Sequence, residues 1–178
     1  MTEKEFYQKY KLDALINGLK YGILPSITLA QASIESANGN SFLAKYGKNF
    51  FGIKAYSNPD NLPVIYANDD LQNEPFRKYN SVKESFKDHS IFLIENSRYK
   101  PLFDSTDFNY WADTLQAQGY ATSPVYASTI KSRIKNNDLD KLDFIVKYRW
   151  LFIILGVALI IFILYLIYKY VIKKYIFA

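Results

Sequence analysis

Residues 23–54 read ILPSITLAQASIESANGNSFLAKYGKNFFGIK, and their first half predicts a helix that carries a single charge. Pro25 suits the first position of a helix and Gly39 marks an end, so we expect a helix from Pro25 to Asn38. Its residues are small or apolar apart from one polar stripe, and a helix of that kind is usually buried. Burial would raise the pKa of the Glu35 carboxyl group, which makes Glu35 a candidate general acid. The alternative is an ordinary helix glutamate that is solvated or paired with a lysine.

Further motifs follow one another along the chain. They are AQASIES at 30–36, GNS at 39–41, NFFGIK at 49–54, FRKYNS at 76–81, DH at 88–89 and GYATSPVY at 119–126. In this order and rough spacing the motifs cover about residues 6–142. Together they resemble the bacterial peptidoglycan endo-beta-N-acetylglucosaminidase family, whose members include domains similar to the flagellar muramidase domain.

The resemblance implies a fold and a reaction. The implied fold is α+β but mainly α, a lysozyme-like helical domain with a small β-lobe. The implied reaction is hydrolysis of the β-1,4 bond after N-acetylglucosamine in peptidoglycan glycan strands, with Glu35 as the general acid and with no cofactor or metal. Two alternatives stay open: a muramidase or lytic transglycosylase on a similar scaffold, and a non-catalytic protein that binds peptidoglycan or assists assembly.

A second catalytic carboxylate is expected from the β-lobe of the resembling family, but the family's Thr-x-Glu signature is absent here. Asp70 lies closest in register and is the first candidate. Glu74 is the only glutamate of the lobe and is the second candidate. Asp69 and Asp70 are equally suited to a turn between two strands.

Other site residues follow from the same resemblance. Tyr120 matches a cleft tyrosine that positions the sugar or the reacting groups, and we count it with the catalytic residues. The candidates for substrate binding are Gln31, Asn49, Phe51 and Tyr126. The alternative for Phe50 and Phe51 is core packing, which we expect for at least one of them. His89 is expected to be structural because this chemistry does not require an imidazole.

The rest of the domain reads as helices around two short strands. Apolar periodicity and capping residues predict helices over residues 12–21, 82–99, 108–118 and 124–136. Strand-like segments are expected at residues 64–66 and 76–79. Leu12, Leu15, Ile16 and Leu19 should form the buried face of the first helix. We expect the catalytic domain to cover residues 1–143.

Charge is distributed unevenly along the chain. The 178 residues carry a net charge of +5, of which residues 149–178 contribute +4 without any acidic residue. The domain itself is almost neutral, so the sequence predicts no nucleic-acid partner. The absence of cysteine and the single histidine exclude a metal site rich in these residues.

The C-terminal segment predicts a membrane anchor. Residues 150–168 contain no charged residue and would form roughly 28 Å of helix, which is long enough to cross the hydrocarbon core of a bilayer. We expect a short juxtamembrane linker at 144–149, one transmembrane helix at 150–168 and a basic tail at 169–178. The lipid bilayer would then be a partner, with the catalytic domain on the cell-wall side. The cell-envelope or phage lysis machinery is a further candidate partner.

Overall fold

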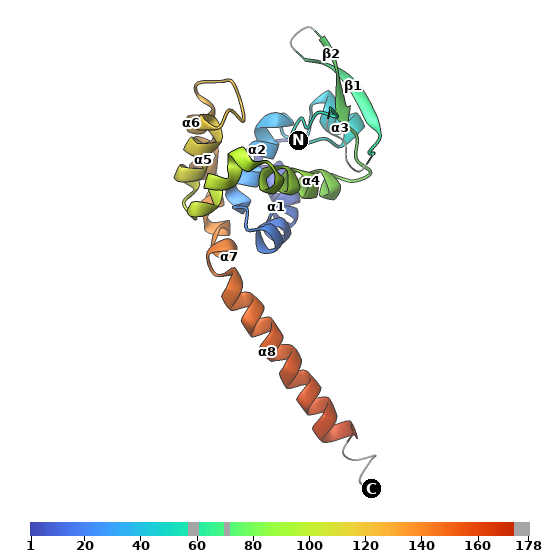
Figure 1. Ribbon diagram of the computed structural model, residues 1–178, viewed down its shortest axis with the longest axis vertical. Helices are drawn as coiled ribbons and strands as arrows, with labels where there is room; N and C mark the ends of the chain where they lie inside the picture. The colour runs from blue at the N-terminus through green and yellow to red at the C-terminus, as the bar shows by residue number, and fades with distance from the viewer. Residues whose placement is uncertain (57–60, 70–71, 173–178) are drawn as a thin grey trace. The chain divides into compact units, whose positions relative to one another are not determined.

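The computed structural model describes residues 1–56, 61–69 and 72–172. The chain divides into two compact units, Met1–Val146 and Lys147–Ala178 (Figure 1). The sequence places the domain boundary at residue 143. The short helix α7 (Phe144–Lys147) begins at the next residue and contains the division between the two units, so the boundary at 143 stays a prediction.

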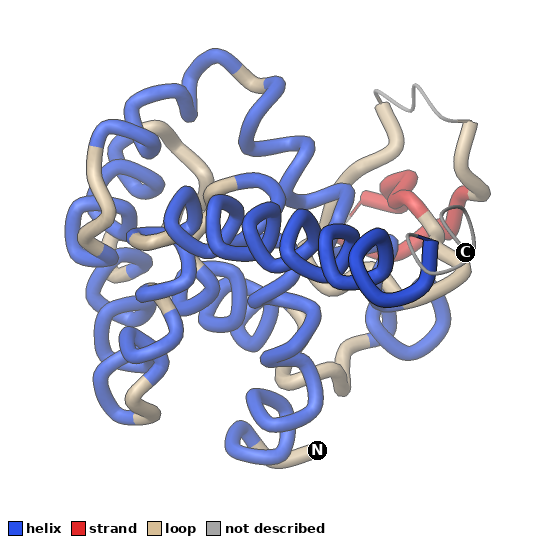
Figure 2. The backbone as a smooth tube through the Cα atoms, turned by 90° about the horizontal axis from the view of Figure 1, so that it is seen from below, coloured by secondary structure: helices blue, strands red, loops and turns tan. Residues whose placement is uncertain are grey.

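The first unit is mainly helical and carries one β-hairpin, as expected. In chain order its remaining elements are α1 (Glu3–Tyr21), α2 (Pro25–Glu35), α3 (Phe42–Gly47), β1 (Val64–Asp69), β2 (Gln72–Arg77), α4 (Val82–Glu95), the 3-10 helix η1 (Ser97–Asp104), α5 (Phe108–Ala117), α6 (Tyr126–Asn136) and the 3-10 helix η2 (Leu139–Leu142). The two strands lie at one edge of the helical body (Figures 1 and 2).

Helix α2 is the centre of this unit. Every residue from Pro25 to Ser33 is buried, which confirms the expectation of a buried helix. Helices α1, α5 and α6 and the 3-10 helix η2 all contact α2. Because small residues such as Ala30 and Ala32 leave little side-chain bulk, the neighbouring helices pack directly against it.

The prediction that this helix extends to Asn38 was wrong, because α2 ends at Glu35. Ala37, Asn38 and Gly39 have φ angles of 49°, 56° and 74°, and such left-handed residues cannot continue a right-handed helix. Glu35 is therefore the last residue of the helix and stands next to a tight turn.

The face that helix α1 buries also differs from the prediction. Thr2 and Glu5 form a capping box, so the helix begins at Glu3 and not at Leu12. Its buried aromatic residues lie in the first half, with Phe6 and Tyr10 at 0% and 6% exposure, and the second half buries Ala14, Asn17 and Gly18. Leu12, by contrast, is 64% exposed. The sequence pattern alone did not reveal that these aromatic rings meet Phe50 and Phe86 in the core.

The β-lobe is a single antiparallel hairpin in which Val64 pairs with Arg77 and Ala67 pairs with Glu74. Strand β1 extends beyond the predicted segment 64–66, whereas β2 begins at Gln72 and ends at Arg77, so the prediction of strand over residues 78–79 was wrong. Helix α4 ends at Glu95, earlier than predicted, because Asn96 is extended with φ −84° and ψ 107° and the chain then forms η1. Helix α6 begins at Tyr126 and not at residue 124.

The second unit consists of helix α8 (Arg149–Ile167) and a π-helical turn, η3 (Tyr168–Ile172). Within the described residues, Arg149–Tyr170 is a helix of 22 residues, of which 18 consecutive residues have a mean hydropathy of 3.1, and none of those 18 residues is buried. By length and composition this helix could cross a membrane.

Candidate active site

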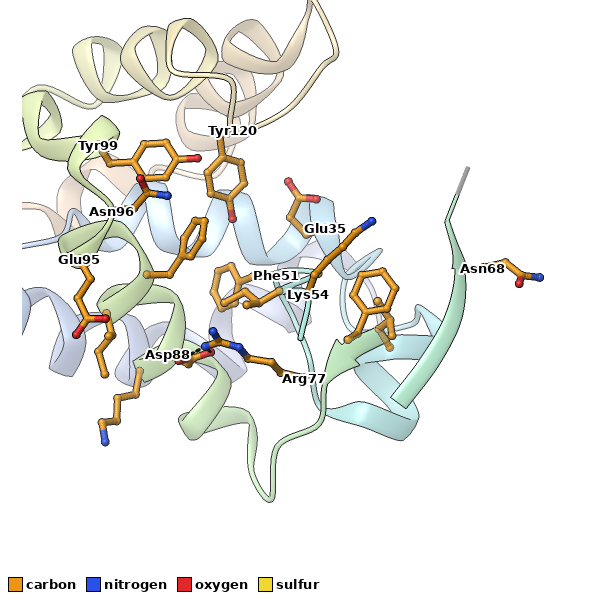
Figure 3. Close-up of a pocket in the computed structure, with 17 residues that line it drawn as sticks. Glu35, Phe51, Lys54, Asn68, Arg77, Asp88, Glu95, Asn96, Tyr99 and Tyr120 are labelled. Atoms are coloured by element: carbon orange, nitrogen blue, oxygen red, sulfur yellow. Dashed lines mark hydrogen bonds and ion pairs between the residues drawn. The ribbon is translucent and has the colours of Figure 1, made fainter. Parts of the chain in front are cut away.

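A cleft of about 990 Å³ runs between the helical body and the β-lobe. Its walls come from the end of α2, the segment from Phe51 to Lys54, strand β2, helix α4 and the loop that carries Tyr120. Figure 3 shows Glu35 and Tyr120 directed into the same space, with Phe51 and Lys54 beside them. The cleft therefore brings together three of the residues that the sequence singled out: Glu35, Phe51 and Tyr120.

Glu35 is a half-buried acid at the edge of this cleft. Its Oε1 atom accepts a hydrogen bond of 3.1 Å from the hydroxyl group of Tyr126. Burial raises the pKa of the Glu35 carboxyl group, and the hydrogen bond from Tyr126 opposes this rise. The carboxyl group thus holds its proton to a higher pH than an exposed glutamate, which is what a general acid requires.

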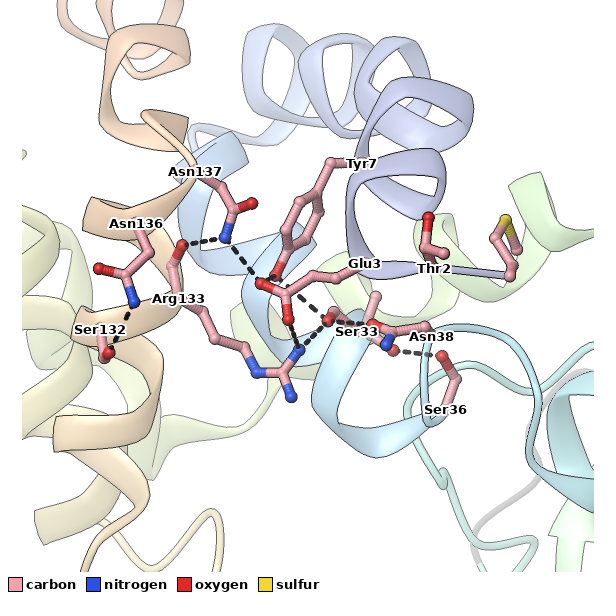
Figure 4. A network of polar contacts seen from close by, with 12 residues as sticks. Thr2, Glu3, Tyr7, Ser33, Ser36, Asn38, Ser132, Arg133, Asn136 and Asn137 are labelled. Atoms are coloured by element: carbon pink, nitrogen blue, oxygen red, sulfur yellow. Dashed lines mark hydrogen bonds and ion pairs between the residues drawn. The ribbon is translucent and has the colours of Figure 1, made fainter.

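The turn after Glu35 is held by a polar network on the opposite side of α2 (Figure 4). The Ser33 hydroxyl oxygen accepts hydrogen bonds from Arg133 at 2.7 Å and from Tyr7 at 3.2 Å, and the hydroxyl donates to Asn38 at 2.7 Å. Arg133 also forms a 2.7 Å ion pair with Glu3. These contacts join α1, α2 and α6, so three elements fix the helix end that carries Glu35.

Tyr120 lines the cleft and packs against two other tyrosines. Its ring stacks on that of Tyr126, with the centroids 5.7 Å apart, and lies 6.0 Å from the ring of Tyr99. Burial raises the pKa of the Tyr120 hydroxyl group well above its ordinary value, and the neighbouring Tyr126 and Glu35 add to this effect. Tyr120 is therefore neutral near neutral pH and offers an apolar ring face and a hydroxyl group to the cleft.

Gln31, Asn49 and Tyr126 are buried and do not line the cleft. The amide of Gln31 donates to the Tyr126 hydroxyl oxygen at 3.0 Å, so both residues stand behind Glu35. Asn49 accepts from the backbone N–H of Ile53 at 3.1 Å and donates to the carbonyl oxygens of Ile53 and Arg77, each at 2.9 Å. In this geometry all three residues support the walls of the cleft, and their direct contact with substrate stays a prediction.

Phe51 combines both roles that the sequence left open, since it lines the cleft and is only 4% exposed. Its ring stacks on the imidazole of His89, with centroids 3.9 Å apart and planes 9° from parallel. His89 is fully buried, and burial lowers its pKa to about 3. A neutral, buried imidazole behind an aromatic wall agrees with a structural histidine.

The two candidates for the second carboxylate differ in what the structure says of them. Asp70 lies outside the described residues. Glu74 is on β2, where its Oε2 atom lies 3.7 Å from the ammonium nitrogen of Lys54. Lys54 lines the cleft whereas Glu74 does not, so the Glu74 carboxylate contacts a residue of the cleft wall without being part of that wall.

One pair of cleft residues was not anticipated from the sequence. Arg77 donates to both carboxylate oxygens of Asp88, at 2.9 Å and 2.7 Å, and Tyr79 donates to one of them at 2.6 Å. All three residues lie within the motifs FRKYNS and DH. The presence of two basic residues in FRKYNS and of an acidic residue in DH was the available signal. In the part of the chain that the structure describes, no three His, Cys, Asp or Glu side chains are grouped to hold a metal ion.

Known structures share this fold. The catalytic domain of the autolysin Auto from Listeria monocytogenes aligns with a TM-score of 0.66 and 29% identity, over 80% of this chain and 88% of that one. The glycoside hydrolase domain of FlgJ from Salmonella typhimurium aligns with a TM-score of 0.65 and 28% identity, over 84% and 96% of the two chains. The fold and the half-buried acid in its cleft define a glycoside hydrolase scaffold.

The family assignment comes from the sequence match. Residues 12–139 match the Glucosaminidase family, described as mannosyl-glycoprotein endo-beta-N-acetylglucosaminidase, and the chain belongs to this family of enzymes. The exo-glucosaminidase LytG of Bacillus subtilis is 37% identical over 136 residues, which are 70% of this chain and 48% of the relative. The peptidoglycan hydrolase FlgJ of Salmonella typhimurium is 30% identical over 143 residues, or 74% and 45%. The chain thus spans less than half the length of these relatives.

Proposed function

We propose that the protein is a peptidoglycan hydrolase that cleaves the β-1,4 bond after N-acetylglucosamine. The observation that carries the proposal is the carboxyl group of Glu35, which is half-buried at the edge of a large cleft and has a raised pKa. The similarity of the chain to a glucosaminidase and to peptidoglycan hydrolases supports peptidoglycan as the substrate. The aromatic side chains of Phe51, Tyr99 and Tyr120 give the cleft apolar faces on which sugar rings can pack.

Glu35 would act on the leaving group. In its protonated form it gives the proton to the glycosidic oxygen while the bond from that oxygen to the anomeric carbon breaks. The hydrogen bond from Tyr126 then stabilises the carboxylate that remains. Asp70 is the first candidate for the carboxylate that activates water or attacks the sugar, and Glu74 is the second. If neither reaches the sugar, the N-acetyl group of the substrate can assist.

The decisive variant is Glu35→Gln, which keeps the shape of the side chain and removes its proton. The full-length chain in detergent would be incubated with purified peptidoglycan, and soluble fragments would be measured. We expect the variant to lose activity by about 100-fold or more, the usual contribution of a general acid. Asp113→Asn is the matched control, because among the described residues this exposed carboxylate on α5 forms its ion pair with Lys131 and lies outside the cleft. Undiminished fragment release by Glu35→Gln would refute the assignment.

Analysis of the products separates the competing activities. A glucosaminidase leaves N-acetylglucosamine at the new reducing end, whereas a muramidase leaves N-acetylmuramic acid and a lytic transglycosylase leaves an anhydro product. Mass spectrometry of the fragments after borohydride reduction distinguishes the three outcomes. Binding to peptidoglycan without release of any fragment would indicate a non-catalytic protein.

We further propose that residues 150–168, within the helix Arg149–Tyr170, anchor the protein in a membrane with the catalytic domain on the cell-wall side. The helix is long enough and uniformly apolar, and a wall-cutting domain must meet the wall. Because the chain contains no cysteine, single cysteines introduced at Ser128 and at Lys169 can be labelled from one side of the membrane. Labelling of intact cells by a membrane-impermeant reagent at position 128 but not at 169 is expected. The reverse pattern would invert the topology, and release of the protein by alkaline carbonate would exclude the anchor.

A further inference from the structure

Behind Glu35, three side chains form a hydrogen-bonded chain that links two helices. The Gln31 amide nitrogen donates to the Tyr126 hydroxyl oxygen at 3.0 Å, and this hydroxyl donates to Glu35 Oε1 at 3.1 Å. Gln31 is fully buried and Tyr126 is 4% exposed. Gln31 lies one helical turn before Glu35 on the same face of α2, so Tyr126, from α6, bridges both residues.

The direction of this chain follows from the end of the Gln31 amide that faces Tyr126, which is the nitrogen, while the Gln31 carbonyl oxygen is buried and has no hydrogen-bond partner within the described residues. A tyrosine hydroxyl has one proton, and an amide NH₂ group can only donate. When Gln31 donates to the Tyr126 oxygen, the hydroxyl proton of Tyr126 is left for Glu35. A donor aimed at a carboxyl group stabilises its ionised form more than its protonated form. The Gln31 amide is thus placed to favour release of the proton from Glu35.

We propose that Gln31 is a positioning residue that acts through Tyr126: it directs the hydroxyl proton of Tyr126 onto Glu35 and so stabilises the carboxylate left after proton transfer. This inference rests on the proposed role of Glu35 as the general acid. The role assigned to Gln31 thereby changes from substrate binding to control of the ionisation of the Glu35 carboxyl group. Without Gln31 the Tyr126 oxygen is free to accept a hydrogen bond from protonated Glu35, which would hold the proton back.

Other polar groups around Glu35 are arranged differently. Tyr120 faces it from the loop before α6, and Lys54 and the Arg77–Asp88 pair face the same cleft from the segment after α3, β2 and α4. Among the described residues, Tyr126 is the group that donates a hydrogen bond to Glu35. That hydrogen bond is also what lowers the pKa of Glu35 against the rise caused by burial. The group that tunes the acid is therefore the group that Gln31 contacts.

The test is a titration of Glu35 in the full-length chain in detergent micelles, followed by NMR of ¹³C-labelled glutamate carboxyl groups. The signal of Glu35 is assigned by its loss in Glu35→Gln. We expect the midpoint to rise by about one pH unit in Gln31→Met, which has a similar size but no donor. Tyr126→Phe should raise the midpoint by at least as much. The double variant should titrate like Tyr126→Phe alone, because Gln31 acts only through the hydroxyl group of Tyr126.

Two controls separate positioning from a general loosening of the structure. Gln116→Met makes the same chemical change on α5 and removes a 2.8 Å hydrogen bond to the backbone N–H of Ala127, but it does not touch the hydroxyl group of Tyr126. Its Glu35 midpoint should equal that of the wild type. Gln31→Glu preserves the shape and provides a second variant if Gln31→Met does not fold. A carboxylate at position 31 would accept the Tyr126 proton, so this variant should show the highest midpoint.

The NMR titration of Glu35 tests the role of Gln31 whether or not the protein cleaves peptidoglycan. An unchanged Glu35 midpoint in folded Gln31→Met and Gln31→Glu, or equal additional shifts in the Tyr126→Phe background, would overturn the proposal. If the midpoints shift as expected while the wild type releases no fragments, the proposed function fails and the positioning role stands. In an active enzyme, Gln31→Met should lower kcat about tenfold, leave KM unchanged and move the basic limb of the kcat profile to higher pH.

Discussion

The guanidinium group of Arg77 lies 2.7 Å from the carboxylate of Asp88, and this pair joins strand β2 to helix α4 along the cleft. The two side chains are only 10% and 11% exposed. Tyr79 donates a third hydrogen bond to the same carboxylate. A nearly buried ion pair therefore links the β-lobe to the helical body, and its two charged groups contact each other in place of water.

Removal of one partner should be strongly destabilising. We expect Asp88→Leu to lower the free energy of unfolding by about 3–5 kcal/mol, because the buried guanidinium group of Arg77 would lose the carboxylate that accepts two of its hydrogen bonds. For a chain of this size this corresponds to a fall of roughly 10 °C in the melting temperature. The double variant Arg77→Leu/Asp88→Leu should be more stable than Asp88→Leu, since the guanidinium charge is removed together with the carboxylate that it contacts. Circular dichroism melting curves of the three proteins measure this order, and a single variant as stable as the wild type would contradict it.

Asp143 should make stability fall as the pH rises. Its carboxylate accepts hydrogen bonds from the backbone N–H and the hydroxyl group of Ser26, at 2.9 Å and 2.6 Å, and burial raises its pKa from 3.8 to about 6. Between these values the folded state keeps a proton that the unfolded state has lost, so the contribution is complete below pH 3.8 and disappears above about pH 6. The loss is roughly 3 kcal/mol at most. In Asp143→Asn, the melting temperature should change less between about pH 4 and pH 7 than in the wild type. Equal changes in both proteins would contradict the assignment.

His89 should have the opposite effect on stability. Burial lowers its pKa from 6.5 to about 3, so below pH 6.5 the unfolded state takes up a proton that the folded state excludes. Stability is therefore lost as the pH falls from 6.5 towards 3. His89→Leu should reduce this acid sensitivity, and it strands no partner because neither ring nitrogen has a hydrogen bond within the described residues.

The comparison is best made in the Asp143→Asn background, where the opposing titration of Asp143 is absent. Melting temperatures of Asp143→Asn and His89→Leu/Asp143→Asn would be recorded from neutral to acid pH. If the melting temperatures of Asp143→Asn and His89→Leu/Asp143→Asn fall in parallel, His89 takes up its proton equally in the folded and unfolded states, and the prediction is wrong.

The sequence was informative where the signal is local. The isolated charge of Glu35 on a helix of small residues predicted both its burial and its raised pKa, and the motif around Tyr120 predicted a place in the cleft. The end of α2 was missed because the left-handed residues after Glu35 include Ala37 and Asn38 as well as a glycine. Asn38-Gly39 is a dipeptide typical of turns, but the left-handed conformation of Ala37 is unusual for alanine, so the residue types alone do not place the end of the helix at Glu35.

Contacts between distant segments were beyond the reach of sequence patterns. Gln31 and Tyr126 are 95 positions apart, and each was assigned to substrate binding because it lies in a motif. Only the packing of α6 on α2 shows that their polar groups meet behind Glu35. The spacing of apolar residues also could not show that Leu12 is exposed, because the core position beside α1 is occupied by the aromatic residues near the start of the helix.

The second carboxylate can be assigned by comparing Asp70→Asn with Glu74→Gln. The Glu74 carboxylate lies 3.7 Å from the Lys54 ammonium nitrogen and does not line the cleft, so we expect Glu74→Gln to keep activity within about tenfold of the wild type. Asp70→Asn should lose about 100-fold or more, because a carboxylate that activates water or attacks the sugar cannot be replaced by an amide. Release of reducing ends from purified peptidoglycan by full-length variants measures both. The reverse result would transfer the role to Glu74. Full activity in both variants would leave the N-acetyl group of the substrate as the assisting group, opposite Glu35.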